Sequence, residues 1–197
     1  MKTTGIIILA AGNSSRLGHA KQLLPFRNKT LLRHVVDEAS AVSNAQTILV
    51  LGAEKESLEQ ELQGSEVIRC YNADWISGMA SSIHVGINKL LEVLPDVSCC
   101  IIAVCDQPYI SSAIFNALLD AFETSSCNLI ASSYADTAGT PALFSRDHFA
   151  DLLQLQGQEG AKKLLSRYSG ELYLVPFEQG AVDIDTEEDY RKLLGES

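Results

Sequence analysis

The chain has 197 residues, of which 46% are hydrophobic and 20% are charged, and its formal net charge is −10. These proportions exclude a largely disordered chain, and the length suits a single domain, 1–197, with a sizeable core. The acidic balance argues against binding to nucleic acid or to an anionic membrane, because both surfaces are themselves negative. A small anionic ligand could bind only where the site supplies local positive charge.

No segment approaches the roughly 20 apolar residues that span a bilayer, so we expect no membrane segment. The apolar run Gly5–Ala11 is short and continues into a polar loop instead of a cleavage site, which favours a buried strand over a signal peptide. The cysteines are odd in number, sit mostly in apolar runs and lack metal-site spacing. They indicate reduced thiols and therefore a cytoplasmic protein. They are Cys70, Cys99, Cys100, Cys105 and Cys127.

Strand-like apolar runs alternate with segments of helical period along the chain. Several runs are continuously apolar, as is typical of parallel strands covered on both faces. The pattern predicts an α/β fold, in which helices on both sides of a mostly parallel sheet form a three-layer α/β/α sandwich. The expected strands are Ile6–Ala10, Thr47–Leu51, Val67–Cys70, Cys99–Val104, Asn128–Ser133, Ala142–Phe144 and Leu172–Val175.

Helical periodicity fills three of the intervals between these strands. Apolar side chains recur at helical spacing over residues 32–42, 83–94 and 114–122. Around Tyr134–Pro141 the alternation weakens, and we expect an excursion from the main sheet that carries substrate contacts. Ligands of open parallel sheets bind beyond the carboxyl ends of the strands, so we expect the site in the segments that follow them.

The loop after the first predicted strand combines small residues with cations. It runs from Leu9 to Gly18 and contains Gly12, two serines and Arg16, and Lys21 follows three residues later. Small residues let the backbone approach a ligand, consecutive N–H groups can bind an anion, and two cations can offset a triphosphate. The loop matches neither of the two commonest phosphate-binding patterns. A surface loop with two solvated cations is the alternative.

The pattern LAAGxSSRxGxxKQLLP resembles the signature of the MobA-like NTP transferases, and especially their molybdenum cofactor cytidylyltransferase branch. The resemblance implies a Rossmann-like sandwich of the nucleotide-diphospho-sugar transferase type. It also implies that the loop Leu9, Ala10, Ala11, Gly12 wraps the NTP phosphates, with Arg16 and Lys21 as the catalytic cations. LAAG in place of LAGG favours cytidylyl over guanylyl transfer.

Asp106 follows the predicted strand Cys99–Val104 and is a candidate ligand for Mg²⁺, which prefers one or two carboxylates with phosphate oxygens and water. A turn or helix-start role is the alternative. Near the C-terminus, Asp183 and Asp185 would face the same side of a strand. Asp185 or Thr186 is also a natural helix N-cap, so a purely structural role explains Asp185 better than Asp183. The two segments resemble the family's DQP and DIDTxEDY elements. This resemblance implies that a residue of the C-terminal segment completes the metal site opposite Asp106, and we expect Asp183, with Asp185 as the alternative.

The segment Asn72–Ile83 follows the third predicted strand and opens a helix. A capped helix with Trp75 packed beside it explains the segment without a ligand. It also resembles the family motif NxxWxxGMxSSI, and this resemblance implies that Gly78 and Ser82 contact the nucleotide base. Residues 139–144 and 157–162 resemble two family elements expected on the acceptor side. In the second, Gln158 stands where the family commonly has Asp, and the consequence is open.

The resemblance implies an enzyme that transfers CMP from CTP to the phosphate of molybdopterin and releases pyrophosphate, with Mg²⁺ as cofactor. An NTP and a molybdopterin-type acceptor are its expected partners, together with a molybdoenzyme or cofactor-delivery protein. The alternatives are guanylyl transfer to molybdopterin, nucleotidyl transfer to a sugar phosphate, and a non-catalytic protein that delivers the cofactor. Fold alone does not choose among acceptors.

Overall fold

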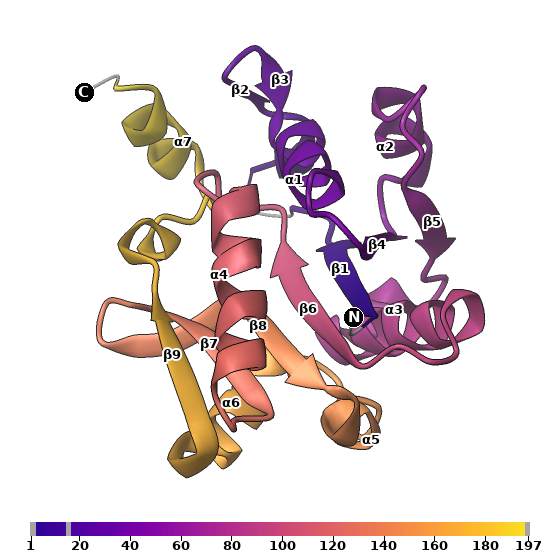
Figure 1. Ribbon diagram of the computed structural model, residues 1–197. Helices are drawn as coiled ribbons and strands as arrows, with labels where there is room; N and C mark the ends of the chain where they lie inside the picture. The colour runs from indigo at the N-terminus through magenta and orange to yellow at the C-terminus, as the bar shows by residue number, and fades with distance from the viewer. Residues whose placement is uncertain (1–2, 15–16, 196–197) are drawn as a thin grey trace.

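The computed structural model describes residues 3–14 and 17–195, in which strands and helices alternate along the chain (Figure 1). The strands are β1 (Thr4–Ala10), β2 (Pro25–Phe26), β3 (Lys29–Thr30), β4 (Ala45–Leu51), β5 (Ile68–Tyr71), β6 (Cys99–Val104), β7 (Leu129–Tyr134), β8 (Thr137–Ser145) and β9 (Leu172–Pro176). The α-helices are α1 (Leu31–Ser40), α2 (Lys55–Glu61), α3 (Met79–Val93), α4 (Ser112–Thr124), α5 (Phe149–Leu152), α6 (Ala161–Arg167) and α7 (Glu187–Leu194). Short 3₁₀ helices are η1 (Lys21–Leu23), η2 (Trp75–Ser77), η3 (Arg146–His148), η4 (Ser169–Glu171) and η5 (Glu178–Ala181).

Within these residues, seven strands form one sheet in the order β5-β4-β1-β6-β8-β7-β9, while β2 and β3 form a separate small hairpin. β8 runs antiparallel to both of its neighbours, and the other pairs in the large sheet are parallel. The predicted mostly parallel sheet is therefore confirmed. All seven strands expected from apolar runs lie in this sheet, and β6 has the predicted bounds.

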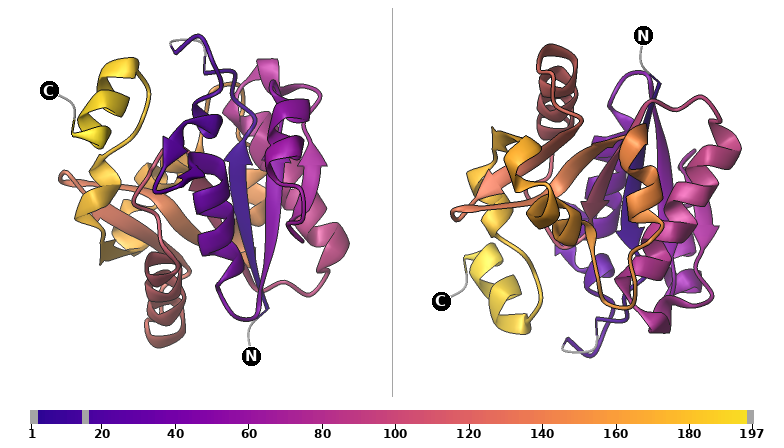
Figure 2. Two further views of the ribbon diagram at one scale, coloured as in Figure 1. Left: turned by 90° about the horizontal axis from the view of Figure 1, so that it is seen from above. Right: turned by 90° about the horizontal axis from the view of Figure 1, so that it is seen from below.

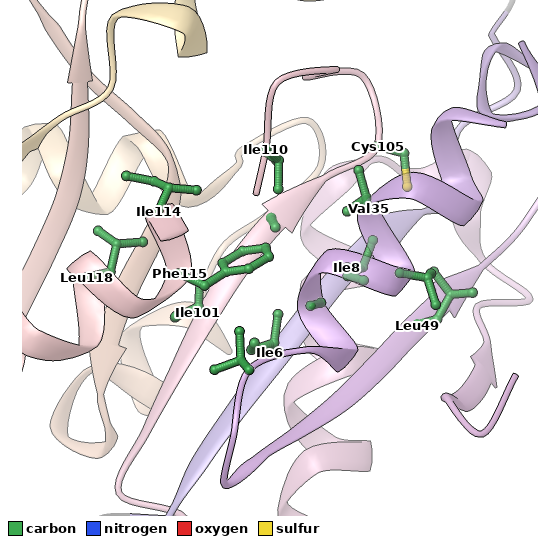
Figure 3. Close-up of a cluster of buried hydrophobic side chains, with 14 of the residues drawn as sticks. Ile6, Ile8, Val35, Leu49, Ile101, Cys105, Ile110, Ile114, Phe115 and Leu118 are labelled. Atoms are coloured by element: carbon green, nitrogen blue, oxygen red, sulfur yellow. The ribbon is translucent and has the colours of Figure 1, made fainter. Parts of the chain in front are cut away.

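Helices cover both faces of the sheet, as the two rotated views show (Figure 2). Ile6 and Ile8 of β1 are fully buried against α1 and α4 on one face, where Val35 and Phe115 join the same cluster (Figure 3). Ile7 is buried on the other face with side chains from α3 and α6. Successive strand residues point to opposite faces, so a continuously apolar strand must be covered twice. This arrangement is the predicted three-layer sandwich.

The expected excursion at Tyr134–Pro141 is wrong, because this segment belongs to the sheet. β7 extends to Tyr134, β8 starts at Thr137, and the two strands pair antiparallel across a two-residue connection. Both connecting residues, Ala135 and Asp136, have positive φ, which is the backbone geometry of a tight hairpin turn. A turn of this kind needs only two residues, so it interrupts the strand pattern of the sequence over a short stretch.

β1 and β6 are neighbouring parallel strands, and their register decides what lies at the edge of the sheet. Leu9 pairs with Val104, so the chain leaves both strands at the same level. The loop that begins with Ala11 and the turn that carries Asp106 are therefore side by side beyond the carboxyl ends, where ligands of such sheets bind.

None of the five cysteines, all of which lie within the described ranges, forms a disulfide, and Cys99, Cys100 and Cys105 are buried. Burial raises the pKa of Cys70 to about 11, so this thiol stays protonated at neutral pH. The expected core placement holds for Cys99, Cys100 and Cys105, whereas Cys70 and Cys127 are only partly buried. None of the helices in the described part of the chain is long and apolar enough to cross a membrane.

Candidate functional site

A cavity of about 600 Å³ opens beyond the carboxyl ends of β1 and β6. Every described residue that the sequence assigned to the nucleotide lines it: Leu9, Ala10, Ala11, Gly12, Lys21, Gly78, Ser82 and Asp106. The remaining lining residues are Asn13, Gln22, Trp75, Ile76, Met79, Val104, Cys105 and Gln158. Arg16 lies outside the described residues, and its role stays a prediction.

The loop after β1 is fixed from inside by Gln22, whose side chain is 2% exposed. Its amide nitrogen donates hydrogen bonds to the carbonyl oxygens of Ala10 (3.2 Å) and Gly12 (3.0 Å). Its amide oxygen accepts from the hydroxyl of Ser14 (3.3 Å), and that hydroxyl accepts from the backbone N–H of Lys21 (3.0 Å). One buried side chain thus couples the backbone that would face a phosphate to the start of η1, which carries Lys21.

Sequence reasoning missed Gln22, although it lies within the recognised run KQLLP. A polar side chain beside an exposed loop is usually solvated, and only the fold reveals that this one is buried with its hydrogen bonds satisfied. The signal that the sequence offered is the position of Gln22 between Lys21 and the apolar residues Leu23–Pro25.

Lys21 joins two carboxylates that are distant in the sequence. Its ammonium nitrogen Nζ lies 2.7 Å from Oδ2 of Asp106 and 2.8 Å from Oδ1 of Asp185. Burial alone would lower the pKa of Lys21, but the negative charge of Asp106 and the hydrogen bonds to both carboxylates outweigh it and raise that pKa above its ordinary value. Lys21 therefore remains positively charged at the cavity.

The C-terminal segment Asp183-Ile184-Asp185 reaches the site because its central residue is buried. Ile184 is fully buried in a small cluster with Leu24, Phe26 and Leu31. Its backbone N–H donates to the carbonyl oxygen of Asp106 at 2.9 Å, which fixes the segment beside the turn after β6. Residues 182–185 are not part of a strand, so the strand geometry proposed for the two flanking aspartates does not occur.

Thr186, not Asp185, caps α7. The Thr186 hydroxyl accepts from the backbone N–H of Asp189 at 3.2 Å, and the Asp189 carboxylate accepts from the backbone N–H of Thr186 at 2.9 Å. This reciprocal arrangement is a capping box. Of the two caps that the sequence left open, the structure selects Thr186, so the carboxylate of Asp185 is available to Lys21.

Asp183 lies on the other side of Ile184 and has an exposed side chain. Partial desolvation of its carboxyl group, followed by the negative charges of Asp185 and Asp106, raises the pKa of Asp183. Three carboxylates therefore share one region of negative potential, within which Lys21 pairs with Asp106 and Asp185. Whether Asp183 binds a metal stays a prediction, and Asp185 is the aspartate that converges with Asp106 on one cation.

This convergence also tests whether the residues suit a divalent metal ion. Two carboxylate oxygens already approach a single cationic centre, and oxygen ligands are those that Mg²⁺ prefers. Across residues 3–14 and 17–195, no cluster of three or more His, Cys, Asp or Glu side chains is arranged to hold an ion by itself. The donor set fits an ion that takes its remaining ligands from phosphate and water, as Mg²⁺ commonly does.

The segment between β5 and α3 forms the opposite wall of the cavity. Asn72 is buried, and its amide nitrogen donates to the hydroxyls of Ser81 (2.7 Å) and Ser82 (2.9 Å). Gly78 precedes α3 with φ 118°, and a side chain there would overlap the carbonyl oxygen of Gly157. The backbone N–H of Ala80 donates to that same oxygen at 3.1 Å. Gly78 is thus required for two loops to meet.

The two segments expected on the acceptor side lie in different places. Gln158 lines the same cavity as Gly78, because the loop that contains it packs against the start of α3. Thr140 is in β8 and donates from its hydroxyl to the amide oxygen of the buried Gln107 at 3.2 Å. The amide nitrogen of Gln107 in turn donates to the carbonyl oxygen of Gly180 at 2.8 Å. The β7–β8 hairpin is therefore tied to the turn that carries Asp106.

Comparison with known proteins matches residues 6–172 to a domain described as the MobA-like NTP transferase domain. Among solved structures, the protein Rv0371c of Mycobacterium tuberculosis H37Rv is 30% identical, with 98% of each chain covered and a TM-score of 0.84. The same protein in complex with manganese matches over 100% of both chains, at 28% identity and a TM-score of 0.81.

Two relatives of similar length carry different names. A molybdenum cofactor cytidylyltransferase of Escherichia coli strain K12 is 25% identical, over 96% of this chain and 95% of its own. A nicotine blue oxidoreductase of Paenarthrobacter nicotinovorans is 27% identical, over 95% of both chains. Because these names describe different reactions, relatedness by itself does not select the substrates.

Proposed function

Since the chain belongs to the MobA-like NTP transferase family, we propose that it transfers CMP from CTP to the phosphate of a molybdopterin-type acceptor and releases pyrophosphate. The nucleotidyltransferase class follows from the family, whereas the base, the acceptor and the metal are our proposal. One observation carries it: Lys21, Asp106 and Asp185 converge beside the loop that follows β1, at a cavity that can take a nucleotide.

The phosphate end of the nucleotide is assigned to the loop after β1. The backbone of Ala10, Ala11 and Gly12 would approach the triphosphate, and Arg16 and Lys21 would offset its charge. Gln22 supports this role, since its hydrogen bonds hold the loop in place before any ligand arrives. A donor that is already positioned does not have to reorganise during the reaction, which is how preorganised sites lower a barrier.

The reaction needs no general base from the protein. An acceptor phosphate is already deprotonated near neutral pH, so its oxygen can attack the α-phosphorus as the bond to the bridging oxygen breaks and pyrophosphate leaves. Lys21 and Arg16 would hold the departing oxygens and stabilise their charge. Asp106, with Asp183 or Asp185, would hold Mg²⁺, which when bound neutralises phosphate charge.

The base end is assigned to the opposite wall. Gly78 and Ser82 line the cavity there, and the Ser82 hydroxyl is oriented by the amide of Asn72. We assign cytosine to this wall because LAAG after the first strand resembles the cytidylyl branch. The relative named as a molybdenum cofactor cytidylyltransferase supports the same assignment.

A thermal-shift panel with CTP, GTP, UTP and ATP, each with Mg²⁺, tests the choice of nucleotide, because a ligand stabilises the folded state according to its affinity. At a concentration of 100 Kd the stabilisation is about 2.7 kcal/mol. We expect the largest shift with CTP. A larger shift with GTP or UTP would contradict the cytidylyl assignment and leave the nucleotidyltransferase class untouched.

A further inference from the structure

The ammonium group of Lys21 lies where the carboxylates of Asp106 and Asp185 converge. Both Nζ–oxygen distances are those of charge-assisted hydrogen bonds, at 2.7 and 2.8 Å. The side chain of Lys21 is only 18% exposed and that of Asp106 only 24%, so water screens this ion pair less than an ordinary surface pair. Without a nucleotide, Lys21 therefore acts as the counter-ion of the two aspartates.

Mg²⁺ held by the same two carboxylates would need their oxygens at about 2.0–2.1 Å. Such an ion and the ammonium would lie within a few ångströms of each other, and like charges at that separation repel strongly in a partly buried site. The long, flexible stem of a lysine lets the ammonium move elsewhere. The cavity that Lys21 lines offers such a place once it holds an anion.

We propose that the Lys21 ammonium and a divalent metal ion compete for Asp106 and Asp185, and that Lys21 releases the carboxylates when it pairs with nucleotide phosphates. This inference rests on the proposed function, since it takes the two aspartates as metal ligands. Metal alone therefore binds weakly, because it must displace Lys21. Metal and nucleotide strengthen each other's binding, since the phosphates give Lys21 another partner, and such coupling is reciprocal.

The test measures Mn²⁺ affinity by electron paramagnetic resonance of the free ion, on the chelator-treated chain of residues 1–197 without nucleotide. Lys21→Met removes the competing charge, so we expect its Kd for Mn²⁺ to fall at least about tenfold below that of the wild-type chain, which corresponds to 1.4 kcal/mol. Lys21→Gln serves as a second neutral variant, and melting curves show whether each protein folds.

Lys89→Met is the matched control. Lys89 pairs with Glu92 on α3, ten residues beyond Met79, which is about 15 Å along the helix. The Lys89→Met substitution removes one positive charge, as Lys21→Met does, but at a distance from the cavity. It should leave Mn²⁺ affinity within about twofold of wild type. Adding Asp106→Asn to Lys21→Met should abolish the gain, because the ion then loses a ligand.

Mn²⁺ affinity that is unchanged or weaker in both folded Lys21 variants would overturn the competition. A second arm adds CTP without acceptor and measures Mn²⁺ affinity again, where we expect a smaller nucleotide-dependent gain in Lys21→Met than in wild type. If the protein does not bind CTP, only this second measurement is affected. The metal-only comparison would still decide whether Lys21 and the ion exclude each other.

Discussion

At the scale of single residues, the site depends on the ammonium group of Lys21, which two carboxylates share. Lys21 hydrogen-bonds to two carboxylates from separate parts of the chain, and its backbone N–H is held by Ser14. In a protein with a net charge of −10, a triphosphate can bind only where positive charge is concentrated. Lys21 meets this requirement, and Gln22 fixes the loop beside it.

Lys21→Ala should lower kcat/KM for nucleotidyl transfer by about 10²–10³-fold, by analogy with the loss of one preorganised donor to a developing negative charge. Steady-state pyrophosphate release measures the effect. Lys89→Ala, which removes a lysine from the far part of α3, should retain wild-type turnover. Wild-type turnover in a folded Lys21→Ala protein would refute the role given to Lys21.

Asp183→Asn should stabilise the metal-free protein at pH 7. The pKa of Asp183 is raised in the folded state, so the folded chain binds this proton more tightly than the unfolded chain, and stability falls as pH rises from the ordinary value of 3.8 through the raised value. The asparagine variant should melt at a higher temperature at pH 7 and at the wild-type temperature near pH 3, with chelator present.

Asp189→Asn should change the melting temperature in the opposite direction, although it lies near Asp183 in the sequence. The hydrogen bond from Thr186 lowers the pKa of Asp189, so its charged form stabilises the fold above the ordinary carboxyl pKa. This variant should melt below wild type at pH 7. For the first variant, a melting temperature below that of wild type at pH 7 would contradict the raised pKa of Asp183.

At the scale of elements, two loops meet at the start of α3 because Gly78 has no side chain. The positive φ there and the nearby carbonyl of Gly157 both disfavour any larger residue. The contact brings Gln158 to the cavity beside Met79. The loop before α6 and the start of α3 therefore form one wall, although they are about 80 residues apart in the chain.

Gly78→Ala should destabilise the fold by about 1–3 kcal/mol, since it adds backbone strain and forces the two loops apart. Urea unfolding measures the loss as a lower midpoint. Gly170→Ala is the control, because a side chain at Gly170 would meet no atom within 4 Å. Equal midpoints for the two variants would show that the loop contact is not as close as described.

Elements differ in how well the sequence predicts them. β6 was predicted to the residue, since Ser98 and Asp106 confine the continuously apolar run between them to a short stretch. The β7–β8 connection was missed because its turn is Ala135-Asp136, which lacks the glycine that usually marks a tight hairpin. The N-cap of α7 was left open between Asp185 and Thr186, since both types cap helices and only the fold gives Asp185 another partner.

At the scale of the whole molecule, the topology brings distant segments to one edge of the sheet. The sequence predicted that the site would lie in the segments that follow the strands, and the structure shows that β1 and β6 are neighbours whose following segments meet at one edge. It could not predict the strand order, or that Ile184 would anchor the C-terminal aspartates beside Asp106, since both depend on long-range packing. Packing of Ile184 thus brings Asp185 to Lys21 beside Asp106, and the choice between Asp183 and Asp185 as metal ligand stays a prediction.

The proposed single domain also has a consequence at this scale. The C-terminal segment packs through Ile184 against Leu24 and Phe26, so it should unfold together with the N-terminal half. We expect one cooperative transition in urea, with circular dichroism and Trp75 fluorescence coinciding. Two separated transitions would contradict a single folding unit.

The site formed by Lys21 and Asp106 is proposed to carry out nucleotidyl transfer. To test this, the protein is mixed with CTP, Mg²⁺ and phosphate-bearing molybdopterin, and the pyrophosphate released is measured. We predict one pyrophosphate released for each acceptor consumed, and little from the Lys21→Ala variant. Tight CTP binding with no pyrophosphate release in the presence of acceptor would contradict the claim and indicate a protein that carries its ligand without reacting it.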